Sequence, residues 1–416
     1  ANDKPYLNEL VDILVMIKTS KLNQFGNTSH SKFTLWMFTF LMLALLAYAT
    51  GCSSQQEDLS SMSVGRWSHS ATLLDDGRVL IVGGKERPYG SVPSTEIFDP
   101  TNNSWSSAGN TLKPRGEGHT AILLNNGQVL VTGGTEDGSS ELYDPDENKW
   151  LYADNMMESR KWASATLLPD GRVIIVGGDD ASRSGSKELD SAEIYNPSTN
   201  KWSLANNMNH AHSGHSATMI NNKLLIIGKD SAELFDPLTG VWSLTGNPVR
   251  ARSTGSTATT MANGKVLVTG GEWHKDGTRH DLSNIIGSAA SVGGSHGGPT
   301  ARHRLTTVEL LDHAELHDYN SGTWKSTNKM SEGRSDHVSI LTNDGKVVIV
   351  GSYTLEEFDP KTQNWSEIGS LANNHGQSYT ATLITENKIL IVGGKEDSKT
   401  GIRGITDTEI FEIPDN

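Results

Sequence analysis

Short apolar runs and polar turns alternate in one fixed order from about residue 62 to the end of the chain. In the first unit, a run that follows His69 ends before Asp76 and Gly77. The continuous apolar run 79–82 then leads into two glycines. Each run has the length of a strand and is too short to indicate a helix. The pattern therefore predicts four β-strands per unit.

The unit occurs seven times. The glycine pair, or its remnant, stands at 83–84, 133–134, 177–178, 228–229, 270–271, 351–352 and 393–394. Six units carry a later tryptophan in register, at Trp105, Trp150, Trp202, Trp242, Trp324 and Trp365. Repetition of this kind indicates units that bury their faces against one another. We expect the six tryptophans to lie in the core.

Each part of the unit has a physical reason. Asp76-Gly77 separates two apolar runs, where a two-residue hairpin requires positive φ at both central residues. Asn221-Asn222 and Glu386-Asn387 are weaker versions of that turn. The run 79–82 is apolar at every position, which is typical of a strand buried on both faces. Asp99-Pro100 ends the third strand, because proline cannot donate to a strand ladder.

Four antiparallel strands that stack as blades predict one all-β domain, a seven-bladed β-propeller over residues 62–416. Units of about 50 residues with a double glycine and a later aromatic resemble the kelch-repeat family. The expected blades span 62–110, 111–156, 157–207, 208–247, 248–329, 330–370 and 371–416.

The seventh unit lacks a fourth strand and its tryptophan. An unpaired strand edge is a liability in a closed ring. The segment before Met62 occupies the position that the fourth strand takes before every later blade. We therefore expect residues 54–60, within a lipidated N-terminus over 52–61, to pair with the third strand of the last blade near Ile410.

The N-terminal part predicts export. Lysines precede an apolar run at 33–49, and small residues and Cys52 follow it at once, which is the layout of a signal segment. Residues 49–52 resemble the lipobox of bacterial lipoproteins, which implies that residues 1–51 form an extension and signal segment and that Cys52 carries the lipid. Ser53 implies, by the same resemblance, an outer-membrane protein of the bacterial cell envelope, on the periplasmic or the surface side. A plain signal anchor is the alternative, because the run is close to spanning length.

The charge and composition of the chain restrict the classes of partner and cofactor that it is expected to bind. A net charge of −14 disfavours nucleic acid, because the field of the molecule repels a polyanion. Cys52 is the only cysteine, which excludes an intrachain disulfide. Galactose oxidase-like enzymes of the resembled family use copper with a cysteine–tyrosine crosslink, so the lack of a second cysteine disfavours that activity. We expect no cofactor, no metal and a monomer.

The connections between second and third strands, and those between blades, emerge together on one face of a propeller. We call this the variable face, since it holds all the length variation, with its longest excursion between Glu272 and His313. A residue just before each first strand recurs once per blade: Arg66, Arg115, Arg160, His212, Arg252, Arg334 and His375. These side chains either line the channel entrance, where guanidinium groups bind carboxylates, or pack the blades.

Three further tryptophans, Trp67, Trp162 and Trp273, are out of register and map to the variable face, as does His274. Exposed aromatic side chains there are suited to stack on sugar rings or to anchor a protein. The alternative for each of the three tryptophans is to cover a blade edge. The histidines of the long excursion follow no zinc-ligand spacing.

Two functions remain open. One is an envelope-anchored lipoprotein, membrane-bound through its lipid, whose propeller recognises a glycan or protein partner through the variable face. The other is a carbohydrate-active enzyme, an epimerase or lyase acting on an acidic sugar in an Arg- and His-lined channel. The resembled family includes such an epimerase of the bacterial envelope. No acid–base pair stands out from the repeat, so the first hypothesis is preferred and enzymatic activity stays uncertain.

Overall fold

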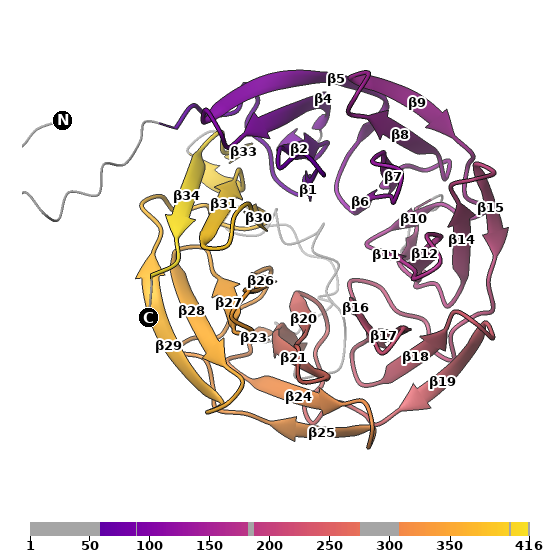
Figure 1. Ribbon diagram of the computed structural model, residues 1–416, viewed down its shortest axis with the longest axis vertical. Helices are drawn as coiled ribbons and strands as arrows, with labels where there is room; N and C mark the ends of the chain where they lie inside the picture. The colour runs from indigo at the N-terminus through magenta and orange to yellow at the C-terminus, as the bar shows by residue number, and fades with distance from the viewer. Residues whose placement is uncertain (1–58, 89, 182–186, 275–307, 399–400, 415–416) are drawn as a thin grey trace, which may run out of the picture. The chain divides into compact units, whose positions relative to one another are not determined.

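The chain forms a ring of seven radial antiparallel sheets (Figure 1). The structure, a computed structural model, describes residues 59–88, 90–181, 187–274, 308–398 and 401–414. Each sheet is one blade, and the first strand of each blade lies nearest the centre of the ring. The predicted seven-bladed β-propeller is confirmed.

Strand order within a blade follows the chain. The first strands are β1 (Ser70–Leu73), β6 (His119–Leu123), β11 (Ser164–Leu167), β16 (Ser216–Ile220), β20 (Ser256–Thr260), β26 (Val338–Leu341) and β30 (Thr380–Leu383). The second strands are β2 (Val79–Val82), β7 (Val129–Gly133), β12 (Val173–Val176), β17 (Lys223–Ile227), β21 (Lys265–Gly270), β27 (Val347–Val350) and β31 (Lys388–Val392). The third strands are β4 (Gly90–Asp99), β8 (Ser140–Asp144), β14 (Ala192–Asn196), β18 (Ala232–Asp236), β24 (Ala314–Asp318), β28 (Thr354–Asp359) and β34 (Thr408–Glu412). The outer strands are β5 (Ser104–Arg115), β9 (Lys149–Ala153), β15 (Lys201–Leu204), β19 (Val241–Thr245), β25 (Thr323–Ser326) and β29 (Asn364–Ser370).

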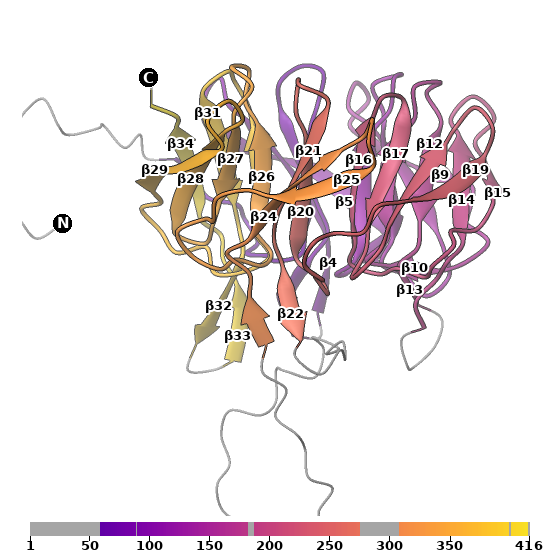
Figure 2. The same cartoon turned by 90° about the horizontal axis from the view of Figure 1, so that it is seen from below.

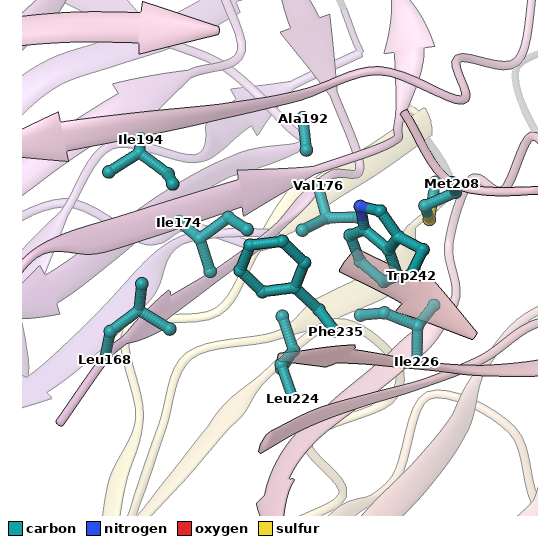
Figure 3. Close-up of a cluster of buried hydrophobic side chains, with 10 residues drawn as sticks. All are labelled: Leu168, Ile174, Val176, Ala192, Ile194, Met208, Leu224, Ile226, Phe235 and Trp242. Carbon is teal, nitrogen blue, oxygen red and sulfur yellow. The ribbon is translucent and has the colours of Figure 1, made fainter. Parts of the chain in front are cut away.

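The core lies between neighbouring blades. The second strands β2, β12 and β27 are buried at every position, as their unbroken apolar sequences predict. Between blades three and four, Val176 and Ile174 pack against Leu224, Ile226 and the ring of Phe235 (Figure 3). Equivalent clusters join the other blades, so each sheet is stabilised by the apolar face of the next.

The hairpin turns differ from the prediction. In the Asp76-Gly77 turn only Gly77 has positive φ, and Leu74 pairs its NH with the carbonyl of Arg78. This is a longer turn that needs one left-handed residue, the place that glycine takes. The predicted two-residue geometry occurs at Asn221-Asn222, where both residues have positive φ and Ile220 pairs with Lys223.

The double glycine joins one blade to the next through the backbone. The NH of Gly84 donates to the carbonyl of Arg115 at 2.9 Å, and the second glycines of blades two, three, five and seven make the same bond to their neighbours. These second glycines have φ between +70° and +112°, a region that only glycine enters readily. In blade seven, Gly394 donates to Arg66 at 2.9 Å, which joins the last blade to the first.

Blades four and six lack the second glycine, and there the bond runs in the opposite direction. Arg252 NH donates to the carbonyl of Lys229 at 2.7 Å, and His375 NH donates to that of Ser352 at 3.3 Å. Neither Lys229 nor Ser352 has positive φ. An ordinary residue in this position therefore keeps the contact between blades by accepting the hydrogen bond.

The repeated tryptophans occupy equivalent sites on the fourth strands. Each packs on an aromatic or His side chain of the third strand, with ring centroids 4.8 to 5.2 Å apart. Trp150, Trp202 and Trp242 are buried, whereas the other three are partly exposed, so only half of the set lies fully in the core. Several indoles donate to a carbonyl of the preceding blade, as Trp150 does to Ala108 at 2.9 Å.

Blade seven has three paired strands among the described residues, β30, β31 and β34. Most of the segment expected to close it, residues 54–58, lies outside the described residues, and Leu59 and Ser60 belong to no strand. Residues 60 and 62 nevertheless make two hydrogen bonds of the kind that the fourth strands of other blades make near their ends. Trp105 donates its indole NH to the carbonyl of Ser60 at 2.8 Å, and Met62 NH donates to Thr406 at 3.1 Å. The pairing of residues 54–60 near Ile410 stays a prediction.

Among the described residues, no helix is long and apolar enough to cross a membrane. The predicted signal segment and Cys52 lie outside the described part of the chain.

Replacing Trp202 with Ala should lower the free energy of unfolding by roughly 3–5 kcal/mol, the usual cost of truncating a buried aromatic side chain. Leu204→Ala is the control, because Leu204 lies on the same strand and is exposed. Its substitution should change stability by less than about 0.5 kcal/mol. Denaturant unfolding of both variants measures the difference, and equal losses would contradict the assigned packing.

Candidate binding face

The variable face has an uneven height. Blades one, five and seven extend it with the hairpins β3 (Lys85–Arg87) to β4, β22 (Glu272–His274) to β23 (Val308–Leu310), and β32 (Lys395–Ser398) to β33 (Gly401–Gly404). Figure 2 shows β22, β23, β32 and β33 projecting from one side of the ring. Blades four and six instead close with tight turns, in which Gly228 bonds to Ser231 and Gly351 to Thr354. Blade four is therefore recessed between its neighbours.

The Arg and His constellation is buried. Each member pairs with a glutamate of the third strand in its own blade, as Arg115 does with Glu141 at 2.6 Å. The full set is Arg66–Glu96, Arg115–Glu141, Arg160–Glu193, His212–Glu233, Arg252–Glu315, Arg334–Glu356 and His375–Glu409. Arg115 also donates to the carbonyls of Gly133 and Ser139, and so joins the end of one strand to the start of the next.

The glutamates complete this arrangement with backbone donors. Glu141 accepts from the NH groups of Leu112 and Lys113, which belong to the chain that enters from the preceding blade. Glu96, Glu193, Glu233, Glu315, Glu356 and Glu409 accept in the same way. Hydrogen bonds from a charged side chain and from backbone NH groups therefore compensate each carboxylate for its loss of hydration.

The structure favours packing over ligand binding for these seven side chains. Arg66, Arg115 and Arg160 have no exposed surface, and their guanidinium groups are already engaged by the chain. The repeated glutamates were visible in the sequence, three residues before most of the Asp-Pro pairs. Sequence reasoning missed them because buried carboxylates are uncommon unless they are paired.

The unrepeated tryptophans separate into different environments. Trp67 is buried, which favours packing over ligand binding, and its backbone exchanges two hydrogen bonds with that of Lys85. Trp162 is partly exposed. Trp273 is also partly exposed and lies under the guanidinium of Arg250, 5.3 Å from its ring centroid. The side chain of His274 lies outside the described part of the structure.

One residue before each first strand has positive φ in all seven blades. The set is Ser68, Gly118, Trp162, Gly214, Gly255, Asp336 and Ser378. Backbone bonds link several of them around the axis, including Trp162 NH to Gly118 at 3.0 Å and Gly214 NH to Trp162 at 3.1 Å. A tryptophan in this region is strained, and such strain is often concentrated at functional sites. We call this ring the channel mouth.

Asp336 is the carboxylate of the channel mouth, and its side chain is partly exposed. Among the described residues, its carboxylate has no hydrogen-bond or ion-pair partner. Desolvation raises the pKa of Asp336 above its ordinary value, although the charge of Lys395 acts in the opposite direction. A carboxylate with a raised pKa is suited to proton transfer or to binding a ligand hydroxyl. In the sequence, the glycines at this position in blades two, four and five were the feature that could have indicated the ring of positive-φ residues.

A pocket of about 550 Å³ lies at recessed blade four. It is lined by Glu188, Asn209, His210, Ala211, His212, Ser213, Lys229, Asp230, Ser231 and Ser253. Glu188 comes from blade three, Ser253 from the entry to blade five, and Lys229 and Asp230 from the short turn beneath. Of the sequence candidates only His212 borders this pocket, and its side chain is buried.

Among the described residues, no three His, Cys, Asp or Glu side chains are arranged to hold a metal ion. Most of the histidine-rich excursion, residues 275–307, lies outside the described part of the chain.

Residues 39–229 match a family model described as the KLHDC2/KLHL20/DRC7 Kelch-repeats domain. Kelch repeat-containing protein kel-10 of Caenorhabditis elegans is 23% identical over 228 residues, which cover 51% of this chain and 34% of that protein. These matches support a kelch-repeat family for this chain. The Kelch repeat and BTB domain-containing protein F47D12.7 of Caenorhabditis elegans is 26% identical over 129 residues, 29% of this chain and 22% of that protein. The matched part of this chain thus spans about a third or less of the length of these curated relatives.

Solved structures share the fold of the kelch propeller. A fungal alcohol oxidase of the AA5 family, in complex with copper, superposes with a TM-score of 0.64 at 16% identity over 85% of this chain and 75% of the oxidase. The structure of YjhT has a TM-score of 0.51 at 16% identity over 86% of this chain and 98% of its own. At this identity the likeness shows the fold alone. Kelch propellers commonly serve as binding and protein-interaction modules.

Replacing Arg115 with Ala should lower the free energy of unfolding by roughly 3–5 kcal/mol, because it leaves the carboxylate of Glu141 buried without its charged partner. The control is Lys149→Ala, which removes an exposed ion pair to Glu147 and should cost less than about 1 kcal/mol. Thermal and denaturant unfolding measure both variants. An Arg115→Ala protein of unchanged stability would contradict the packing role.

Proposed function

We propose that this kelch propeller is an envelope-anchored lipoprotein that recognises a glycan in the blade-four pocket of its variable face. The observation that carries the glycan proposal is the chemistry of the pocket. Nine of its ten lining residues are polar, whereas most pockets for drug-like ligands are lined by apolar side chains. Hydroxyls, amides, carboxylates and an ammonium group together match a ligand that presents many hydroxyl groups.

The size and position of the pocket support the same conclusion. A volume of about 550 Å³ lies within the range of small-ligand sites and suits one or two sugar rings. Because blade four is recessed, an extended glycan chain can enter the pocket over its short connection. A protein partner that uses the exposed aromatic side chains of the variable face is the alternative within the binding hypothesis.

A second function, an enzyme acting on a sugar, is favoured by one observation. Asp336 holds a carboxylate at the channel mouth with a raised pKa, as a proton donor or acceptor requires. The buried Arg and His constellation supplies no cation to this site, so an acidic substrate would need other partners. The two sites are separate in sequence and can be tested separately.

Asp230→Trp should block the pocket and weaken glycan binding by at least about tenfold, because a large side chain would fill the recess. Asp230 is exposed, so the substitution should leave the fold intact. Leu238→Trp is the matched control, on an exposed turn of the same blade outside the pocket lining. The full chain in detergent is applied to a glycan array, and the glycans retained are titrated.

Equal binding by the two variants would contradict the pocket proposal, and a complete lack of retained glycans would contradict the glycan proposal. Chemical change of a retained glycan would instead support the enzyme function. In that case Asp336→Asn should abolish turnover, whereas an unaffected rate would exclude Asp336 from the chemistry.

Anchoring rests on Cys52, which follows the apolar run at residues 33–49. Cys52→Ser should abolish incorporation of labelled palmitate in a bacterial host, because the hydroxyl cannot accept the thioether-linked lipid. The labelled protein is followed by electrophoresis of membrane fractions. Undiminished labelling of Cys52→Ser would contradict the lipoprotein proposal, while palmitate-free protein that stays in the membrane would support a signal anchor.

A further inference from the structure

His210 borders the blade-four pocket with about half of its side chain exposed. It occupies a position that recurs in other blades, where the backbone NH bonds to the buried glutamate. The other occupants are Lys113, Glu158, Arg250 and Asn373. Among these described equivalents, only blade four has an imidazole at this position.

Glu233 determines which nitrogen of His210 carries the proton. Its side chain is fully buried and accepts from the NH groups of Asn209 and His210 at 2.8 and 2.9 Å, and from the side-chain amide of Asn209 at 2.8 Å. These donors and the neighbouring His212 hold the pKa of Glu233 at about 2, although burial alone would raise it. An ionised carboxylate is only an acceptor.

The Nδ1 atom of His210 lies 3.2 Å from a carboxylate oxygen of Glu233. Because that oxygen can only accept, Nδ1 must donate, and a ring that carries a single proton holds it on Nδ1. The other nitrogen, Nε2, then has a free lone pair. Among the described residues Nε2 has no partner.

We infer that His210 is the specificity-determining acceptor of the pocket, oriented by Glu233, and that the pocket selects neutral sugars whose hydroxyl or amide N–H groups donate to Nε2. This inference rests on the proposed glycan function and adds a ligand class to it. A carboxylate-bearing sugar would present acceptors to an acceptor nitrogen, in a pocket where the carboxylates of Glu188 and Asp230 outnumber the ammonium group of Lys229. The pocket therefore disfavours acidic sugars.

Blade seven provides an internal comparison. His375 also lies beside a buried glutamate, Glu409, but its side chain is fully buried and its Nδ1 contacts the carbonyl of Gly393 at 2.8 Å. The position equivalent to His210 is Asn373. A substitution at Glu409 thus disturbs the same kind of buried carboxylate without touching His210.

The first experiment reads the tautomer of His210 directly in the full chain. Two-dimensional ¹H–¹⁵N spectra of the histidine rings, recorded at neutral pH, should show His210 with a protonated Nδ1 and an unprotonated Nε2. Glu233→Gln should return the ring to the tautomer mixture of an exposed histidine, while Glu409→Gln should leave it unchanged. A proton on Nε2 in the unsubstituted protein would overturn the inference, whether or not Glu233→Gln folds.

The second experiment adds ligand, with N-acetylglucosamine as the neutral probe and N-acetylneuraminic acid as the acidic one. The neutral sugar should shift the Nε2 resonance and bind at least about tenfold more tightly than the acidic sugar. His210→Phe, which keeps a ring but removes the acceptor, should reduce that binding at least about tenfold. Tighter binding of the acidic sugar, or unchanged binding by His210→Phe, would overturn the inference.

The outcomes separate the inference from the proposed function. The glycan function would fail if His210 has the expected tautomer but no sugar shifts its resonances and the array retains no glycan. Glycan binding with the opposite tautomer would mean that the pocket functions but that His210 is not its acceptor.

Discussion

A buried carboxylate on the third strand of every blade is the interaction on which the ring depends. Removing a glutamate from water is costly unless each oxygen finds donors. In this protein the donors are a guanidinium or imidazole of the same blade and backbone NH groups of the incoming chain. Satisfying the carboxylate therefore fixes the path between blades, and this requirement is repeated at each junction.

Blade four departs from the repeat in several respects that act together. It has His212 in place of arginine and Lys229 in place of the second glycine, and it has a tight connection in place of a long one. The pocket lies at this short turn, and Glu233 contacts the imidazole of His210 beside it. The same changes that weaken the resemblance to the other units thus create the pocket. Irregularity within a repeat is the natural place to look for function, because the repeated residues already serve the architecture.

The sequence predicted the environment of some residues and not of others. Continuous apolar strands were interpreted correctly, because their burial on both faces follows from the unbroken run of apolar residues. The repeated arginines could be placed before each first strand, but not assigned to the channel or to the core, since their direction depends on the partner glutamates about 30 residues later. The sequence left open whether Trp67 contacts a ligand or covers a blade edge, and in the structure its side chain is buried.

The sequence by itself determined the number of blades, their strand order and the face that carries the long connections, because each rests on periodicity and turn chemistry within one unit. Only the tertiary structure decided which polar side chains are accessible. His210, Asp230 and Ser253 come from different connections and meet only after the ring has formed. Asp336 reaches the channel mouth only because seven equivalent backbones converge on the axis. Sites assembled between repeats depend on three-dimensional closure, which no single unit of the sequence encodes.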